Sequence, residues 1–396
     1  MKRRDFLTKS SLASSLLMVP NFMKAFEGLD PVSLGHKKLV LIQLSGGNDG
    51  LNTIIPYRND LYYKHRPSIS IPKNKLIDVN GELGFNENLG PLKLLYDKGY
   101  LSIINNVGYP NPNRSHFRST DIWQTASSSS EYLDTGWMGR YIDQCGKNPH
   151  SGIEVDDSLS LIMKGETMNG IATRDAKKMF NNTKTPFFGK VLETQTPSHL
   201  SEHNLGYLYK TMVSAKSSAK YIYETSKTSK SIKTYPNNAF AKQLKTTAEF
   251  INSGLETKVY YVSMGGFDTH AYQSNRQARL LKTYAQGMDV FVNDLEASDS
   301  FKDTLVVTFS EFGRRVQQNA AAGTDHGAAS NLFIIGKNLR KPGFYNSSPD
   351  LSNLDGNGDL KYTVDFRSVY ATLLDQWLDA SHSKILGKSF KTLNFI

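Results

Sequence analysis

The run TLVVTFS (residues 304–310) decides the fold class, because it is apolar almost throughout and does not alternate with polar side chains. Such a run is typical of a strand that is buried on both faces of a parallel sheet. The segment before it, 272–298, carries apolar residues at helical spacing and leads directly into the strand. A helix that feeds a buried strand indicates an α/β sandwich with right-handed crossovers.

The same pattern recurs along the chain. A second helical pattern, 236–254, opens with Pro and polar residues, closes at Gly254 and leads into another apolar run. A closing amphipathic helix is expected to begin near Asp365. The remaining predicted strands are KLVLIQL (38–44), LSIINNV (101–107), VYYVSM (259–264) and LFIIG (332–336).

One interval differs from the rest. Residues 146–233 are rich in Ser, Thr, Lys and Asn and contain only weak strand patterns. We expect one α/β domain over residues 36–396, in which this interval forms an insertion or cap over the sheet.

The net charge of the chain limits the classes of partner that we expect it to bind. The formal net charge is +10, of which residues 1–27 supply +3. A surplus of this kind attracts anionic substrates or envelope polymers. Nucleic acid is not an expected partner, because the lysines are spread out and no nucleic-acid-binding signature is present.

The amino terminus, MKRRDFLTKSSLASSLLMVPNFMKAF, has the form of an export address. Arg3 and Arg4 precede Asp-Phe-Leu and a moderately apolar run, which indicates the twin-arginine export machinery as a partner. An ordinary secretory signal or a frayed helix is the alternative. We expect a signal over 1–27, a periplasmic or exported location and no transmembrane helix in the mature chain. Cys145, the only cysteine, is compatible with folding before export.

Polar residues follow the predicted strands, where ligands gather in α/β sheets. The polar residues after each strand also have a structural interpretation. They could belong to a tight turn, cap a helix or form a surface ion pair. Two carboxylates with two imidazoles suit a divalent metal ion, and an arginine suits a tetrahedral anion. The predicted metal ligands are Asp49, Asp268, His270, Glu311, Asp325 and His326, with Arg314 as a catalytic residue and Asn48 as a substrate-binding residue.

Ser115, in NRSHFRSTDIW, is the candidate nucleophile. It lies where a helix is expected to begin, and the helix start favours an anionic oxygen there. Ser115 or Ser119 could instead cap that helix. His116 and Arg118, on the same segment, are candidate substrate-binding residues.

Seven segments, in order, resemble the domain of unknown function 1501 family, exported proteins of the alkaline phosphatase-like clan. The resemblance runs from the start of the chain to about Leu339. It implies an alkaline phosphatase-like three-layer α/β sandwich with a mostly parallel central sheet, and metal-assisted phosphate or sulfate ester chemistry. The matching segments are RRDFL, LIQLSGGNDGLN, NRSHFRSTDIW, TGWMGRYID, GGFDTH, FSEFGRR and GTDHG.

Residue by residue, the resemblance implies Asp49 as the first metal carboxylate, Ser115 as the nucleophile and His326 as the last histidine ligand. Asp268 and His270 would hold one metal ion, and Glu311 would replace a later Asp.

The departures from the clan leave the number of ions open at two, one or none. Ser45-Gly46-Gly47 intervenes after the first strand, Glu311-Phe312 replaces an Asp-His pair, and Asp268 and His270 are closer together than usual.

The sequence therefore predicts an exported hydrolase or transferase of phosphate or sulfate esters. One or two ions of zinc, manganese, calcium or magnesium would assist it, and its substrate would be an anionic ester. The alternative is a non-catalytic binding or assembly protein of the cell envelope, including a polysaccharide-binding module.

Overall fold

The computed structural model describes residues 37–186, 190 and 203–396. The predicted export signal, 1–27, lies outside these residues, as does part of the predicted cap. Among the residues that are described, no helix is both long enough and apolar enough to cross a membrane.

The core of the domain is a large sheet with the order β11-β5-β10-β9-β1-β8-β6-β7, and β12 pairs with β5. All of its paired strands run parallel except at β10, which is antiparallel to both of its neighbours. The strands are β1 (Lys38–Leu44), β5 (Leu101–Gly108), β6 (Gly152–Glu154), β7 (Ile171–Ala172), β8 (Val259–Met264), β9 (Thr304–Phe309), β10 (Ser330–Ile335), β11 (Gly343–Phe344) and β12 (Val364–Asp365).

The direction of β10 differs from the parallel pairing that its apolar run suggested. Its sequence could not reveal this, because a strand buried on both faces is apolar in either direction. The consequence is that the loop from Ser310 to Ala329 leaves β9 and enters β10 at one edge of the sheet.

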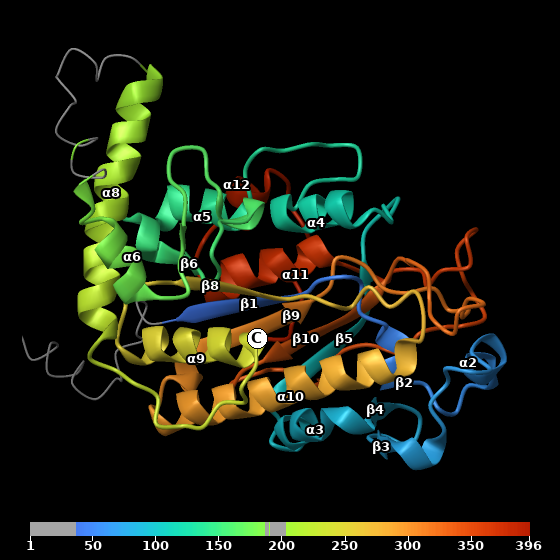
Figure 1. Ribbon diagram of the computed structural model, residues 1–396. Coiled ribbons are helices and arrows are strands. Elements are labelled where there is room, and N and C mark those ends of the chain that lie inside the picture. Colours follow the sequence, from blue (N-terminus) through green and yellow to red (C-terminus); the bar gives the residue numbers. More distant parts are fainter. Residues whose placement is uncertain (1–36, 187–189, 191–202) are drawn as a thin grey trace, which may run out of the picture. The chain divides into compact units, whose positions relative to one another are not determined.

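Both faces of the sheet are buried, and β1 shows how. Val40 and Ile42 pack into one apolar cluster, while Leu39 and Leu41 pack into another on the opposite face. Helices cover both faces, so the predicted α/β class with a mostly parallel sheet is confirmed (Figure 1). One layer contains α3 (Gly90–Asp97), α9 (Ala239–Asn252) and α10 (Gln273–Ala297); the other contains α4 (His116–Thr125), α5 (Trp137–Cys145), α11 (Phe366–Thr372) and α12 (His382–Leu386).

The interval 146–233 in part extends the sheet. β6 pairs with β8 and β7 pairs with β6, so these segments lie at the sheet edge. The interval also forms α6 (Ala176–Asn182) and α8 (His203–Ser226), which pack on each other, and Phe180 stacks on Tyr223.

Smaller elements complete the domain. The predicted closing helix begins after Asp365, whose side chain accepts a hydrogen bond from the Arg367 N–H, and it changes to π-helix at η9 (Leu373–Trp377). A second sheet has the order β2-β4-β3. Its strands and the remaining helices are β2 (Ile54–Ile55), β3 (Leu76–Asp78), β4 (Gly84–Asn86), α2 (Asp60–His65), η2 (Gly50–Asn52), η3 (Lys73–Lys75), η4 (Glu87–Leu89), η5 (Pro149–Ser151), η6 (Leu161–Met163) and η8 (Phe301–Asp303).

Candidate metal centre

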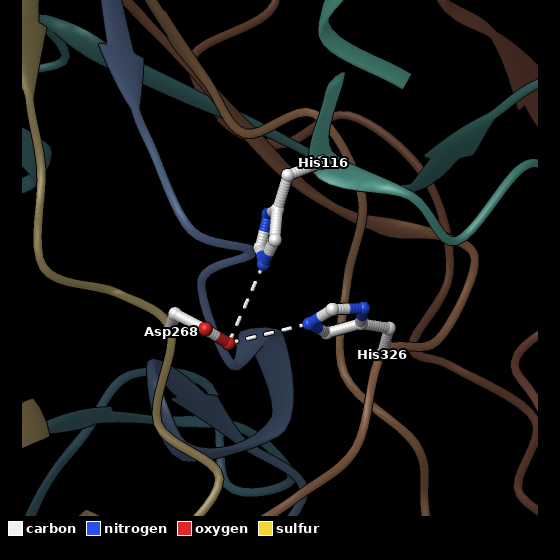
Figure 2. A group of neighbouring side chains, drawn as sticks. All are labelled: His116, Asp268 and His326. Atoms are coloured by element: carbon white, nitrogen blue, oxygen red, sulfur yellow. Dashed lines mark hydrogen bonds and ion pairs between the residues drawn. The ribbon is translucent and has the colours of Figure 1, made fainter. Parts of the chain in front are cut away.

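Three imidazoles gather around one carboxylate oxygen, Asp268 Oδ1. The Nε2 atoms of His116, His270 and His326 lie 3.4, 3.0 and 3.2 Å from it. Figure 2 shows His116 and His326 pointing at Asp268 from separate segments. Asp268 and His270 follow β8, His116 opens α4, and His326 lies in the loop that enters β10. We call these four residues the histidine cluster.

Each of the three imidazoles is also held from behind, through Nδ1. His116 Nδ1 lies 2.9 Å from Glu311 Oε1, and His270 Nδ1 lies 3.2 Å from Asp325 Oδ1. His326 Nδ1 lies 2.7 Å from the Arg114 carbonyl oxygen. Carboxylates and a carbonyl only accept hydrogen bonds, so Nδ1 donates in each case. In a neutral imidazole the lone pair then lies on Nε2, and all three lone pairs face Asp268.

This arrangement fits a divalent metal ion. Four ligands around zinc at its usual bond lengths stand about 3.3 Å apart. The separations to Asp268 Oδ1 and the 2.9 Å between His270 Nε2 and His326 Nε2 are close to that spacing. His116 Nε2 is buried and has no hydrogen-bond partner in the described part of the chain. Metal-binding histidines typically donate their other ring N–H as these do. The donor set therefore suits zinc or a similar ion, and His116, Asp268 and His326 alone already form a potential metal-binding group.

Glu311, predicted as a metal ligand, lies behind the cluster. Its carboxylate is fully buried and also accepts hydrogen bonds from the Gly46 N–H at 2.7 Å and from Gln43 Nε2 at 3.3 Å. Gly46 has a φ of +118°, and a Cβ there would stand 2.3 Å from the Asp268 nitrogen. Only glycine allows this approach. Glu311 is therefore placed to orient His116.

Arg314 was predicted as a catalytic residue, but its side chain supports the fold. The guanidinium is buried and donates to the carbonyl oxygens of Gly46, Gly47, Phe267 and Thr324. It also donates to Asp268 Oδ1 at 2.7 Å. These bonds join the loops after β1, β8 and β9, and they leave the fork closed to a substrate anion.

Three more predicted site residues lie apart from the cluster. Asp49, predicted as a metal ligand, is fully buried in an ion pair with Arg66 at 2.6 Å. Asn48 is buried and bonded to Thr53 and Gln277. Arg118 donates to the carbonyls of the Ser128–Ser129 turn, away from the imidazoles. These hydrogen bonds hold all three side chains inside the fold, although Asp49 Oδ1 and Arg118 Nε have no partner among the described residues.

Ser115 is the N-cap residue of α4, but its hydroxyl makes no capping hydrogen bond. Its backbone N–H donates to Asn113 Oδ1 at 2.8 Å, and the residue is exposed. Ser119 is buried, and its hydroxyl lies 2.8 Å from the Tyr109 hydroxyl. The hydroxyl of Ser115 is therefore available to solvent next to His116, whereas that of Ser119 is committed to the core.

The pKa directions follow the same contacts. Partial burial raises the pKa of Asp268, but the hydrogen bond from the Arg314 guanidinium and its positive charge outweigh this effect and hold the pKa below its usual range. The hydrogen bond to Glu311 raises the pKa of His116. Desolvation lowers the pKa of His326. Asp325 has a lowered pKa, chiefly because Asn319 donates to it.

Sequence reasoning did not place two arginines that border the cluster. Arg114 and Arg315 both face the buried carboxylate of Asp359, and their side chains are 30% and 39% exposed. Arg114 also supplies the carbonyl that holds His326. The sequence did contain a signal for these two arginines, because Arg114 is adjacent to Ser115 and Arg315 is adjacent to Arg314. The side-chain directions depend on Asp359, which is remote in sequence.

Comparison with known proteins identifies the family of the chain. The family model described as "Protein of unknown function (DUF1501)" matches residues 100–386. A search of the curated proteins finds no match. Several solved structures are similar at low sequence identity.

The lipoteichoic acid synthase LtaP from Listeria monocytogenes is 9% identical, with 79% of this chain and 68% of that chain covered and a TM-score of 0.38. A protein in the alkaline phosphatase superfamily from Vibrio parahaemolyticus is 12% identical, with coverages of 89% and 69% and a TM-score of 0.39. The PsFucS1 sulfatase from Pseudoalteromonas sp. is 11% identical, with coverages of 95% and 75% and a TM-score of 0.38. At these values the likenesses carry no argument about activity.

Proposed function

We propose, for a chain that belongs to the DUF1501 family of proteins of unknown function, a metal-assisted hydrolysis or transfer of phosphate or sulfate esters. The observation that carries this proposal is the convergence of three imidazole Nε2 atoms on Asp268 Oδ1, each imidazole being held through Nδ1. Three lone pairs and a carboxylate oxygen repel one another unless a cation lies between them.

The histidine cluster would hold one divalent ion, with zinc or manganese preferred over magnesium or calcium because three of the four donors are nitrogen. When bound, such an ion polarises a phosphoryl or sulfuryl oxygen and stabilises negative charge. Glu311 and Asp325 would orient the imidazoles, and Arg314 would fix the position of Asp268.

Arg114 and Arg315 would bind the anionic group of the substrate. Together they carry two positive charges against the single carboxylate of Asp359, and both are partly exposed. A guanidinium offers a planar pair of donors that matches a tetrahedral anion. In this proposal Arg315 and Arg114 therefore take the anion-binding role that was predicted for Arg314.

Ser115 would act as the nucleophile. Its Oγ would bond to the phosphorus or sulfur atom while the bond to the ester oxygen breaks. The serine proton would pass to solvent, and the leaving alcohol would take a proton from solvent, which reaches this exposed residue. Water would then release the acid in hydrolysis, or an acceptor alcohol would take the group in transfer.

One observation favours a second candidate, a non-catalytic envelope protein. Arg314 already donates to Asp268 Oδ1 at 2.7 Å, and the pKa of His116 is raised by its hydrogen bond to Glu311. The guanidinium charge would balance Asp268 without a metal ion, and this would leave a polar binding surface.

Metal analysis separates the two candidates. Purified protein should contain about one zinc or manganese ion per chain, and adding the ion at about 100 times its Kd should stabilise the fold by about 2.7 kcal/mol. His326→Ala should abolish both effects, and His382→Ala, a histidine paired with Asp375 elsewhere, should change neither. Metal-free protein with no thermal shift would leave the non-catalytic candidate.

Ser115→Ala tests the nucleophile. Turnover of an aryl phosphate or aryl sulfate should fall at least about a hundredfold, since the covalent step is lost while the metal is retained. Ser130→Ala, at another exposed serine, is the matched control. Unchanged turnover in Ser115→Ala would remove this residue from the mechanism.

A further inference from the structure

Two aromatic side chains stand in solvent beside the histidine cluster. Phe117 directly follows His116 and is 87% exposed. Tyr272 lies two residues after His270 and is 84% exposed. Only two other phenyl or phenol rings are exposed among the side chains that the structure describes, those of Tyr132 and Tyr362. The two most exposed rings therefore both border the cluster.

The backbone around Tyr272 is held in place by a neighbouring loop. The N–H groups of Tyr272 and Gln273 donate to the carbonyls of Ala321 and Ala322, both at 3.0 Å. Asn319 Nδ2 donates to the His270 carbonyl at 2.8 Å. These bonds hold Tyr272 at a φ of 46°.

A φ of that value is strained for a residue other than glycine, and such strain persists only where the surroundings impose it. Tyr272 is thus fixed in an unfavourable conformation while its ring gains little burial in return. Residues of this kind concentrate at sites that bind ligands.

We propose that Phe117 and Tyr272 receive the sugar ring of a carbohydrate ester whose anionic group lies at the histidine cluster. The inference rests on the proposed function and names its substrate class. The apolar face of a sugar ring packs on an aromatic ring, while its hydroxyl groups remain in contact with water and polar side chains.

The polar surroundings favour a sugar over an acyl chain. Asn113, Arg114 and Ser115 precede the cluster on the segment of Phe117, and none of them is apolar. On the other side, Asn319 lies in the loop beside Tyr272, since its Nδ2 donates to the His270 carbonyl. Two separate rings among polar side chains give no contiguous apolar surface of the kind that binds a lipid tail.

Tyr132 provides a matched control. Its ring is 77% exposed, but the Arg118 guanidinium lies 3.8 Å from the ring centroid and so occupies one face of it. A sugar ring cannot stack on that face.

The experiment measures retardation of the protein in native gels that contain dextran sulfate or uncharged dextran. Phe117→Ala and Tyr272→Ala should each bind dextran sulfate about tenfold more weakly than the wild type, and Tyr132→Ala should bind as the wild type does. Tyr272→Gly, which adopts a positive φ without strain, should lose binding to the same extent while folding at least as well as Tyr272→Ala.

Equal retardation of the wild type, Phe117→Ala and Tyr272→Gly would overturn the inference. A repeat after treatment with EDTA separates it from the proposed function. If the metal proposal fails, EDTA changes nothing, yet the losses in Phe117→Ala and Tyr272→Gly remain. If only the present inference fails, EDTA weakens the binding and the aromatic substitutions do not.

Discussion

Individual polar residues at the strand ends divide into those that face the cluster and those that support the fold. Glu311, Asp49 and Glu154 are all buried carboxylates at the carboxyl ends of strands in the large sheet. Glu311 contacts an imidazole and Asp49 contacts an arginine. Among the residues that the structure describes, the Glu154 carboxylate accepts hydrogen bonds only from Ser160. A buried carboxylate without a cationic partner favours its neutral form.

Glu154 gives a pH-dependent prediction. Burial raises its pKa from 4.5 to about 7. Between these values the unfolded chain loses the proton and the folded chain keeps it, so the folded state loses stability as the pH rises. The loss amounts to about 3 kcal/mol and is complete above pH 7. Urea unfolding of EDTA-treated protein should show Glu154→Gln gaining this amount over the wild type between pH 4.5 and 8. Parallel pH profiles would contradict the prediction.

At the scale of elements, the candidate site is formed by loops that follow several different strands. The loops after β1, β8 and β9 meet because β1 lies between β8 and β9, and because β10 returns antiparallel. Arg314 then donates to all three loops. The cluster therefore depends on this one buried side chain for its loop spacing.

Arg314→Met should destabilise the protein by about 3–5 kcal/mol, because it leaves four carbonyl oxygens and Asp268 without a buried donor. Arg174→Met is the control, since Arg174 forms a surface pair with Asp156 and should cost less than about 1 kcal/mol. Urea unfolding measures both. Equal midpoints for the two variants would show that Arg314 does not hold the loops together.

At the scale of the whole molecule, the domain folds around its sheet core without internal disulfide bonds, because Cys145 is the single cysteine of the sequence. The twin-arginine route carries folded proteins, and we propose that this chain uses it to reach the periplasm or the exterior. The proposal rests on the residues RRDFL near the start of the chain.

Replacing both Arg3 and Arg4 by Lys should retain the folded protein in the cytoplasm, since the paired arginines are the feature read by the export machinery. Cell fractionation measures the outcome, and Lys9→Arg serves as the control. An unchanged periplasmic amount would indicate an ordinary secretory signal.

The sequence by itself determined the family, the α/β class and the positions of the main strands. The runs at β1 and β8 match their predicted bounds, because a strand buried on both faces must be apolar at every position. It also determined that Asp268 and His270 lie at the carboxyl edge of the sheet, because they directly follow β8. His326 lies at the same edge because β10 runs antiparallel, which the sequence did not reveal.

Only the tertiary structure decided which of the polar residues face one another. Asp49 and Asp268 both follow strands, yet Arg66 pairs with the first and three imidazoles surround the second. Arg314 was expected at the substrate but lies among carbonyls of three loops. The physical reason is that a buried polar group takes whichever partner the fold brings near, and those partners are remote in sequence.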